Sequence, residues 1–410
     1  MQSLLLVRSL RRPEFRAHFA ERCGRLPPDL VSRLALLPRR PVWIQAVSVG
    51  EVMLARALMT AMEPATCVIS STTPSGRESA ASISAPGLAG VFHFPLDWPS
   101  FVRKTLDAIK PSVFITVETE IWPAMLAECG RRSIPVLIVN GRVSEKSCRR
   151  YRRFARALRV PLDAIRLACM QSEEDAARLE SIGLPSDRVV VTGNMKFDAP
   201  EAADDKVRQL ATAFGIIAGV TPVLVAGSTS PGEEKMILSA LATAGLAGLN
   251  LILAPRHRER FDEVARLLDG WNGTGIPYVR RSRPDGAKGT KVFLLDTLGE
   301  LTAAYRLATI AFVGGSLVAR GGQNLIEPAS AGVPVLFGPH TRNFSTIADA
   351  LIGAGAGARV GDEAALAEAL AMLLSDPGKR RRMGETGRRL ASEHRGATRR
   401  TIDLIRPFLA

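Results

Sequence analysis

The chain has 410 residues, of which 46% are hydrophobic and 23% are charged. This balance is typical of folded globular proteins and argues against disordered, collagen-like and coiled-coil structures. Lysine and arginine outnumber aspartate and glutamate by 54 to 40, which gives a net charge of +14. Such a surplus favours anionic partners, namely nucleic acid, acidic lipid head groups or phosphorylated substrates.

The hydropathy of the chain argues against a membrane-spanning helix. No apolar run approaches the roughly 20 residues that cross a bilayer. The apolar start at residues 4–7 is interrupted by Arg8, and it lacks the apolar core and cleavage site of a secretory signal. We therefore expect a protein that is soluble or attached to a membrane surface in the cytoplasm.

Apolar runs of strand length alternate with longer stretches of helical period, which predicts parallel sheets with crossover helices. In the first half, strands are predicted at 42–48, 66–71, 91–94, 112–117, 135–140, 165–170 and 188–192. Helices are predicted there at 51–62, 121–131, 145–158 and 173–182.

A change of composition at residues 201–220 indicates a linker, after which the pattern restarts. Strands are predicted at 222–226, 250–254, 292–295, 309–313 and 334–337. Helices are predicted at 233–244, 258–268, 299–308 and 323–331, and from 362 to the end with a break near 376–378. We therefore expect two doubly wound, Rossmann-like α/β domains, residues 1–200 and 221–410, that face one another across a cleft.

Polar side chains directly follow three predicted strands of the first domain, where ligands bind open parallel sheets. Glu51 falls at a helix N-terminus, whose dipole alone would keep the carboxylate ionised and available as a base. A glutamate that only stabilises its helix is the slightly favoured alternative. Glu118 and Glu120 follow a second strand and are equally well explained as solvated loop carboxylates. Lys196 follows a third strand and could hold a phosphate or carboxylate as a point charge.

The second domain has three further strand ends with polar or glycine-rich segments, at 255–257, 296–300 and 314–328. Glycines before a helix leave free N–H groups that suit a phosphate. A glutamate one turn into such a helix could bind a pair of ribose hydroxyl groups. Neither a Walker A sequence nor a complete GxGxxG is present, so ATPase and NAD-dependent activities lose support.

One stretch of the first domain is strongly basic and contains no acid. Its arginines are Arg149, Arg150, Arg152, Arg153, Arg156 and Arg159. A solvated helix face is the simple alternative, but six like charges in three turns repel one another. We therefore expect this stretch to face an anion.

Metal and nucleophile chemistry have little support in the sequence. The five histidines are dispersed and no HExxH occurs. The five cysteines are scattered without a CxxC pair, so we expect reduced thiols and neither disulfides nor a zinc site. No GxSxG or Cys/His pattern is present.

A dozen motifs resemble, in order, those of the 3-deoxy-D-manno-octulosonate (Kdo) transferases of lipopolysaccharide synthesis. The motifs are SVGEV, SSTTPSGRESA, FPLDWP, ETEIWP, NGRVSEKS, QSEED, VTGNMKFD, APRH, DTLGEL, FVGGSLV, GGQNLIEPA and GVPVLFGPHTRNF. The similarity extends from about Arg12 to at least Phe344. It implies the two-domain GT-B glycosyltransferase fold.

The resemblance also implies an activity and its site. Family members transfer Kdo from CMP-Kdo to a lipid A precursor with inversion of the anomeric centre, without a metal or other cofactor. By position, Glu51 would be the general base, and Glu118 with Lys196 the pair that stabilises the transition state. In the C-terminal domain, CMP would be held by Pro255, Arg256, His257, Leu298, Gly299, Glu300, Asn324, Leu325, Ile326 and Glu327.

The resemblance assigns acceptor binding to the N-terminal domain. The basic stretch would then meet the phosphates of the acceptor and an anionic membrane surface. We expect peripheral attachment to the cytoplasmic face of the inner membrane.

The chain departs from the family at three points. Gln323 and Gln45 stand where histidine is usual or frequent, and Gln keeps a hydrogen-bond donor but cannot become cationic. Many members carry an N-terminal membrane anchor, whereas this chain has only a short apolar start. We expect peripheral attachment, with a lost or trimmed anchor as the alternative.

Three alternatives to a Kdo transferase stay open. They are another GT-B sugar-nucleotide transferase or epimerase, a catalytically weakened relative, and a nucleic-acid-binding module. The last is disfavoured because aromatic residues make up only 5% of the chain, so we expect no nucleic-acid partner.

Overall fold

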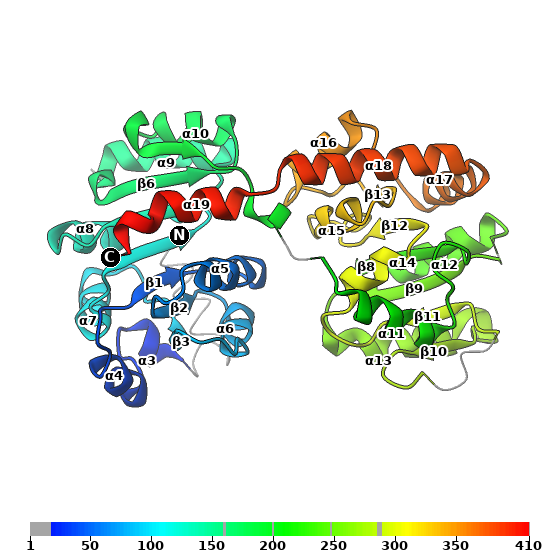
Figure 1. The fold of residues 1–410 in the computed structure, drawn as a ribbon, viewed down its shortest axis with the longest axis horizontal. Helices are drawn as coiled ribbons and strands as arrows, with labels where there is room; N and C mark the ends of the chain where they lie inside the picture. The colour runs from blue at the N-terminus through cyan, green and yellow to red at the C-terminus, as the bar shows by residue number, and fades with distance from the viewer. Residues whose placement is uncertain (1–17, 159–160, 199–200, 247, 285–288, 410) are drawn as a thin grey trace. The chain divides into compact units, whose positions relative to one another are not determined.

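A computed structural model describes the chain from residue 18 to residue 409, except for residues 159–160, 199–200, 247 and 285–288; for residues 153–158 it describes the backbone alone. The chain divides into two compact units. Residues up to Asp198 and the segment from Arg395 onward form the first unit, and the residues between them form the second (Figure 1). Each unit is an α/β structure built on a parallel sheet, which confirms the predicted fold class.

The first unit contains a seven-stranded sheet in the order β3-β2-β1-β4-β5-β6-β7. Its strands are β1 (Val42–Gln45), β2 (Cys67–Ser71), β3 (Leu88–His93), β4 (Val113–Val117), β5 (Val136–Gly141), β6 (Ile165–Met170) and β7 (Val189–Val191). Most are almost continuously apolar, such as VFITV in β4, because helices cover both faces of a parallel sheet. The chain order reverses between β1 and β4, which pair with Val42 opposite Val113. Ligands of such sheets bind at the carboxyl ends of the strands beside this reversal.

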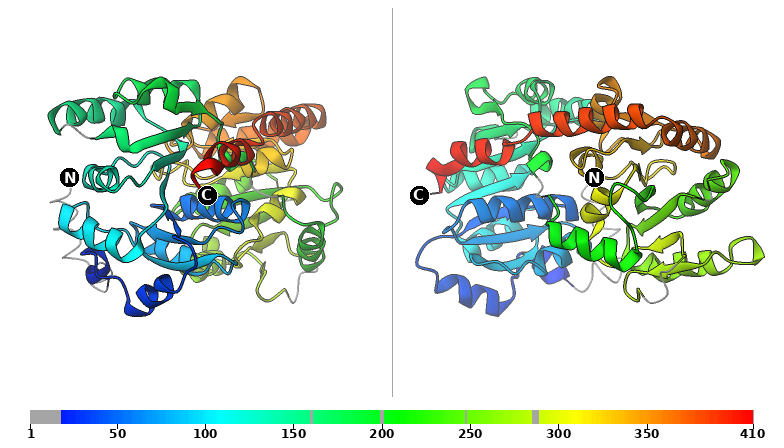
Figure 2. Two further views of the ribbon diagram at one scale, coloured as in Figure 1. Left: turned by 60° about the vertical axis from the view of Figure 1, so that its left-hand side comes forward. Right: turned by 45° about the vertical axis from the view of Figure 1, so that its right-hand side comes forward.

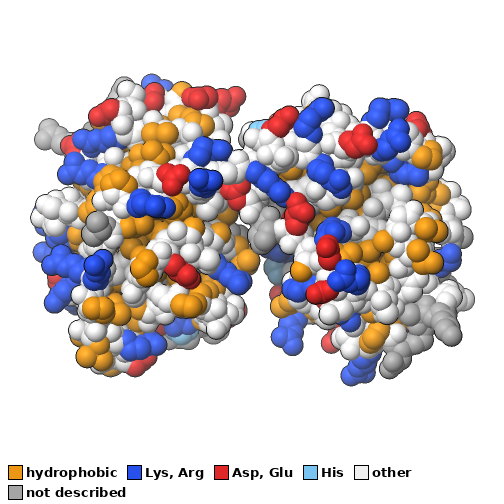
Figure 3. Space-filling view, viewed as in Figure 1, with side chains coloured by type: hydrophobic (Ala, Val, Ile, Leu, Met, Phe, Trp, Pro, Cys, Tyr) orange, Lys and Arg blue, Asp and Glu red, His pale blue; other side chains and the backbone are white. Residues whose placement is uncertain are grey.

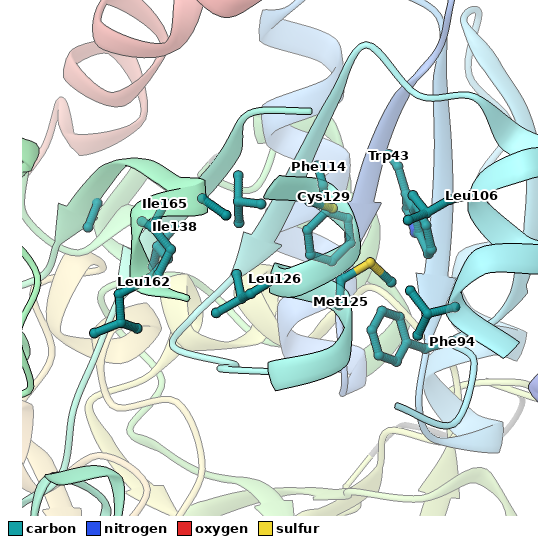
Figure 4. Close-up of a cluster of buried hydrophobic side chains, with 14 of the residues drawn as sticks. Trp43, Phe94, Leu106, Phe114, Met125, Leu126, Cys129, Ile138, Leu162 and Ile165 are labelled. Atoms are coloured by element: carbon teal, nitrogen blue, oxygen red, sulfur yellow. The ribbon is translucent and has the colours of Figure 1, made fainter. Parts of the chain in front are cut away.

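Helices cover both faces of this sheet. They are α3 (Phe19–Arg22), α4 (Pro28–Ala35), α5 (Val49–Ala61), α6 (Pro74–Ala81), α7 (Pro99–Ile109), α8 (Pro123–Arg131), α9 (Glu145–Leu158), α10 (Glu173–Glu180) and α19 (Ala397–Ile405). Because neighbouring strand residues point to opposite faces, Trp43 and Ile44 belong to different cores. The Trp43 ring meets the edge of Phe114 with centroids 5.0 Å apart, in the cluster shown in Figure 4. Ile44 shares the opposite core with Ile402 of α19, which packs beside α5.

The second unit repeats this plan with a seven-stranded sheet in the order β10-β11-β9-β8-β12-β13-β14. Its strands are β8 (Val223–Thr229), β9 (Asn250–Pro255), β10 (Tyr278–Arg280), β11 (Val292–Leu294), β12 (Ile310–Val313), β13 (Val335–Phe337) and β14 (Gly357–Arg359). Its helices are α11 (Asp204–Phe214), α12 (Glu233–Thr243), α13 (Phe261–Asp269), α14 (Leu301–Leu307), α15 (Ile326–Ser330), α16 (Ser345–Gly353), α17 (Glu363–Ser375) and α18 (Pro377–Glu393). Here the order reverses between β8 and β12, where Gly227 pairs with Val313.

The domain boundaries differ from the expected ones in two respects. The expected linker, residues 201–220, contains α11, whose Leu210 and Phe214 are buried in a core of the second unit. The expected second domain, residues 221–410, loses its last segment, because the chain returns after α18 and α19 covers the first sheet (Figures 1 and 2). The helical pattern predicted the helix, but its periodicity could not indicate which sheet it covers.

Candidate active site

Glu51 lies in the first turn of α5, directly after β1, as predicted. The helix begins there because Ser48 Oγ accepts a hydrogen bond from the Glu51 backbone N–H, at 3.4 Å. In return, Glu51 Oε1 accepts from the Ser48 hydroxyl at 2.8 Å, and Oε2 accepts from the Val47 N–H at 2.7 Å. This is the reciprocal pattern of a capping box, except that the glutamate accepts from the N–H of Val47, the residue before the N-cap, instead of the N–H of the N-cap. The carboxylate thus stabilises its helix and is also held in one orientation.

Glu118 directly follows β4, the neighbour of β1 at the reversal of strand order. Its backbone has φ of 60°, a conformation that residues with a Cβ adopt only at a cost, and its N–H donates to Val139 O at 2.9 Å. Glu118 Oε1 accepts a hydrogen bond from Lys196 Nζ at 2.9 Å. Lys196 belongs to the short helix η3 (Met195–Asp198), beyond β7. The structure therefore brings these two predicted residues into direct contact.

Burial raises the pKa of Glu51 to about 7, and the nearby charge of Glu118 adds to the effect. The hydrogen bonds from Val47 and Ser48 and the charge of Lys196 lower this pKa, but they do not compensate. The expectation that the helix dipole alone keeps Glu51 ionised is therefore wrong, because the side chain is 9% exposed and its desolvation outweighs the dipole. The pKa of this carboxyl group therefore lies near neutral pH, well above that of a solvated glutamate.

Glu120 belongs to the same electrostatic cluster. Burial, together with the charges of Glu51 and Glu118, raises its pKa to about 7, against the opposing charge of Arg150. The cluster therefore contains three carboxyl groups that cannot all ionise without repulsion. With pKa values near 7, Glu51 and Glu120 are suited to accept or release a proton.

The start of α9 connects the basic stretch to this cluster. The Arg150 guanidinium lies 5.4 Å from the centre of the Tyr151 ring, and the Tyr151 hydroxyl donates to Thr119 O at 3.5 Å. Arg149, Arg150 and Arg152 are exposed. The side chains of Arg153 and Arg156 and the whole of Arg159 lie outside the described part of the structure. On the face shown in Figure 3, basic side chains lie on both units, interspersed with acidic and apolar ones.

The glycine-rich loop after β12 does not offer the free N–H groups that its sequence predicts. The carboxylate of Glu233, a fully buried residue, accepts hydrogen bonds from the N–H groups of Gly315 at 2.6 Å, Ser316 at 2.9 Å and Leu317 at 2.9 Å. It also accepts from Ser230 N at 2.8 Å. An internal carboxylate thus fills the anion site of this loop. The expectation of a phosphate at these N–H groups is wrong for that reason.

Asn324 and Glu327 form a polar pair beside the end of β12. Asn324 Nδ2 donates to Glu327 Oε1 at 2.9 Å, and the Thr302 hydroxyl donates to Oε2 at 3.4 Å. Burial raises the pKa of Glu327, whereas these hydrogen bonds and the charge of Arg256 lower it. Arg256, which follows β9, therefore acts electrostatically on Glu327 across the carboxyl edge of the sheet.

The remaining predicted donor residues vary in exposure. Pro255 is buried and His257 is exposed. Leu298 is 70% exposed beside Gly299, whose φ is +80°. Glu300 forms an ion pair with Arg281, which donates to its Oε1 from Nε at 3.1 Å and from Nη2 at 2.9 Å.

Leu325 and Ile326 are buried, so their side chains pack in the interior. Sequence reasoning did not single out Arg281 or Thr302, because only the folded chain brings them to Glu300 and Glu327.

The two glutamines that replace histidine lie in different surroundings. Gln45 is fully buried; its Nε2 donates to Thr72 Oγ1 at 3.0 Å, and its Oε1 accepts from the Ser70 hydroxyl. It belongs to the interior of the first unit. Gln323 is half-buried and covers Gly315, where an added Cβ would lie 3.2 Å from its Nε2.

The described residues contain neither a cluster of metal ligands nor a membrane-spanning helix. In that part of the chain, no three or more His, Cys, Asp and Glu side chains are grouped so that they could hold a metal ion. Among the described helices, none combines the length and apolarity that crossing a membrane requires.

Comparisons with known proteins show which family this chain resembles. A family model described as 3-deoxy-D-manno-octulosonic-acid transferase (kdotransferase) matches residues 17–199. The chain is 34% identical to a 3-deoxy-D-manno-octulosonic acid transferase of Haemophilus influenzae, over 98% of this chain and 93% of that protein. It is 35% identical to a transferase of the same name from Bordetella pertussis, over 96% and 91%.

A solved structure shares the fold. The UDP-GlcNAc 2-epimerase of Neisseria meningitidis bound to UDP-GlcNAc superposes with a TM-score of 0.57 and 14% identity, over 89% of this chain and 99% of that one.

Proposed function

The chain belongs to the 3-deoxy-D-manno-octulosonic acid (Kdo) transferase family, and we propose that it transfers Kdo from CMP-Kdo to a lipid A precursor with inversion at the anomeric carbon. As a family member with two parallel-sheet α/β units, it is a glycosyltransferase of the GT-B fold that acts on Kdo. The observation that carries the finer proposal is the cluster of Glu51, Glu118 and Lys196 at the carboxyl ends of β1 and β4.

Glu51 is the proposed general base. With a pKa of about 7, its carboxylate has a base strength matched to neutral pH. It would accept the proton of the acceptor hydroxyl while the oxygen bonds to the anomeric carbon of Kdo. The bond from that carbon to the CMP phosphate breaks on the opposite face, and CMP leaves with the bonding electrons. The two hydrogen bonds that Glu51 accepts fix the direction in which it faces the acceptor.

Glu118 and Lys196 are the proposed electrostatic partners of this step. The Lys196 ammonium group brings positive charge into a cluster of three carboxyl groups, where it can stabilise the negative charge of the Kdo carboxylate or of the transition state. The Glu118 contact holds the flexible lysine side chain at 2.9 Å.

The second unit provides the proposed CMP site. Arg256 and the exposed His257 are suited to the phosphate, and the Asn324–Glu327 pair is suited to the ribose hydroxyl groups. Since Glu233 occupies the N–H groups of residues 315–317, we propose that cationic side chains contribute to phosphate binding. CMP leaves as a monophosphate, with less charge than a nucleoside diphosphate, so we propose that cationic side chains stabilise it without a metal.

The exposed arginines of α9 provide the proposed contact with the acceptor and the membrane. Arg149, Arg150 and Arg152 would meet the acceptor phosphates and the anionic lipids of the cytoplasmic face of the inner membrane, where the protein would attach peripherally. The charge of Arg150 acts on Glu120, which supports this assignment for the part of the basic stretch beside the carboxyl cluster.

The test combines product analysis with one variant and its control. Purified protein is incubated with CMP-Kdo and a tetraacyl lipid A precursor, and the product mass is measured; UDP-sugars replace CMP-Kdo in a parallel reaction. Glu51→Gln should abolish transfer and leave CMP binding, measured by calorimetry, unchanged. The exposed Glu63 is the matched control, and Glu63→Gln should retain full activity. Transfer that persists in Glu51→Gln removes Glu51 from its role, and transfer only from UDP-sugars refutes the proposed donor.

A further inference from the structure

Asp198 holds the start of the C-terminal helix from a position almost two hundred residues earlier in the chain. Its Oδ1 accepts a hydrogen bond from Gly396 N at 2.6 Å, and its Oδ2 accepts from Thr398 N at 2.5 Å. A helix is usually capped by a side chain at its own N-terminus. Gly396, the N-cap of α19, has no side chain and a φ of +89°, so Asp198 takes this role.

Two further contacts join α19 to the other end of the loop that carries Lys196. Arg400 Nε donates to Thr192 O at 2.9 Å, and the hydroxyl groups of Thr401 and Thr192 lie 3.1 Å apart in the interior. Gly193, with φ of +89°, lets the loop approach α19, since a Cβ there would lie 3.1 Å from Arg400 Nη2. The loop from Thr192 to Asp198 is therefore held at both ends by one helix.

Lys196 lies between these two attachments. Its ammonium group is the end of a long flexible side chain, and its position depends on where η3 holds the backbone. An active-site group must be held to within about 0.5 Å, and a displacement of about 1 Å can cost about 100-fold in rate. The contact between Lys196 and Glu118 therefore requires a fixed loop.

We propose that Asp198 is a positioning residue for Lys196, which it serves by fixing η3 to the N-terminus of α19. The proposal rests on the function assigned above to Lys196. The place of Asp198 in the chain fits this role: it is the last residue before the chain leaves the first unit, and Arg395 is the first after it returns. Residues 395–401 thereby become part of the support of the active site.

The first experiment measures kcat and KM of Asp198→Ala in the full-length protein. We expect kcat to fall about 10- to 100-fold, with KM for CMP-Kdo and for the acceptor within about twofold of wild type. A matched control is Asp362→Ala, because Asp362 Oδ1 caps α17 in the second unit through Ala365 N at 2.9 Å. This control should retain wild-type kcat. An unchanged kcat in Asp198→Ala overturns the proposal.

A second experiment separates positioning from general stability. In a Lys196→Ala background, Asp198→Ala should cause no further loss of kcat beyond about twofold, because residues that act as a unit are not additive. If the two losses multiply, Asp198 does not act through Lys196 and the proposal fails. Should Asp198→Ala not fold, Asp198→Asn is measured in the same way, since it keeps one acceptor oxygen.

Hydrogen exchange gives a readout that does not depend on activity. In Asp198→Ala, the N–H groups of Gly396, Thr398 and Lys196 should exchange faster than in wild type, and in Asp362→Ala they should not. Unchanged exchange at all three overturns the proposed attachment. If wild-type protein transfers no Kdo from CMP-Kdo, the proposed function fails, while the exchange measurement still decides whether Asp198 holds the loop.

Discussion

Lys196 Nζ lies 2.9 Å from Glu118 Oε1, although the two residues are 78 positions apart in the chain. The contact joins the segment after β4 to the segment after β7 at the carboxyl edge of one sheet. Glu118 adopts a φ of 60° there, so the surrounding structure maintains a strained backbone to present this carboxylate. Both charges act on Glu51, in opposite directions.

The pH dependence of transfer should respond to these two neighbours with opposite signs. Glu51 is inactive as a base when protonated, so kcat/KM, which reports groups of the free enzyme, should rise with pH through about 7. Glu118→Gln removes a like charge that raises the pKa of Glu51, and its profile should move to lower pH. Lys196→Met removes an opposite charge that lowers this pKa, and its profile should move to higher pH. The residual rate of each variant is measured from pH 5 to pH 9 against wild type.

This prediction has a control variant and a result that would contradict it. A Glu63→Gln variant should have the wild-type profile, because Glu63 is exposed and is not among the groups that shift the pKa of Glu51. Shifts of Glu118→Gln and Lys196→Met in the same direction would contradict the electrostatic account.

Glu51→Gln should stabilise the protein more at high pH than at low pH. The carboxyl group has an ordinary pKa of 4.5 and a folded pKa of about 7. The folded state therefore binds the proton more tightly than the unfolded state does, which stabilises the fold. This stabilisation is fully present below about pH 4.5 and is lost as the pH rises through 7. The wild type should lose up to about 3 kcal/mol from this group over that range, and the glutamine variant should not.

The measurement is the Tm of both proteins at pH 4.5, 6 and 8. The difference between Glu51→Gln and wild type should grow in favour of the variant over this range. The loss of one hydrogen-bond acceptor on Glu51 adds a cost that does not change with pH. A Tm difference that is constant across the series shows that burial does not raise this pKa.

Local patterns predicted twelve of the fourteen strands, all but β10 and β14, and the place of Glu51, because strand periodicity and the first turn of a helix depend on neighbouring residues. The pKa of Glu51 could not be predicted from the sequence. Burial and the charge of Glu118 raise it, and both depend on the folded chain. The same limit applies to α19. Its apolar positions, such as Ile402, predicted a covered helix face but not which sheet covers it.

The glycine-rich loop after β12 shows that local sequence does not reveal what occupies a binding site. Glycines at 314 and 315 predicted converging N–H groups, and these are present. Their occupant, Glu233, lies 82 positions before Gly315 at the start of α12, and nothing in the glycine motif specifies it. Sequence reasoning therefore found an anion site but assigned it to a ligand instead of a side chain of the same chain.

Glu233→Ala should destabilise the second unit and create an empty anion site. It leaves four backbone N–H groups without their acceptor in the interior, which should lower the stability by about 3–5 kcal/mol. Acetate replaces the missing carboxylate in shape and charge, so added acetate should raise the Tm of the variant. The same acetate should leave the Tm of wild type unchanged, because Glu233 already occupies the site. The control is Glu368→Ala on the exposed face of α17, whose Tm should match wild type with and without acetate. A Glu233→Ala protein as stable as wild type would show that the loop does not depend on this carboxylate, and its N–H groups would again be candidates for binding the donor phosphate.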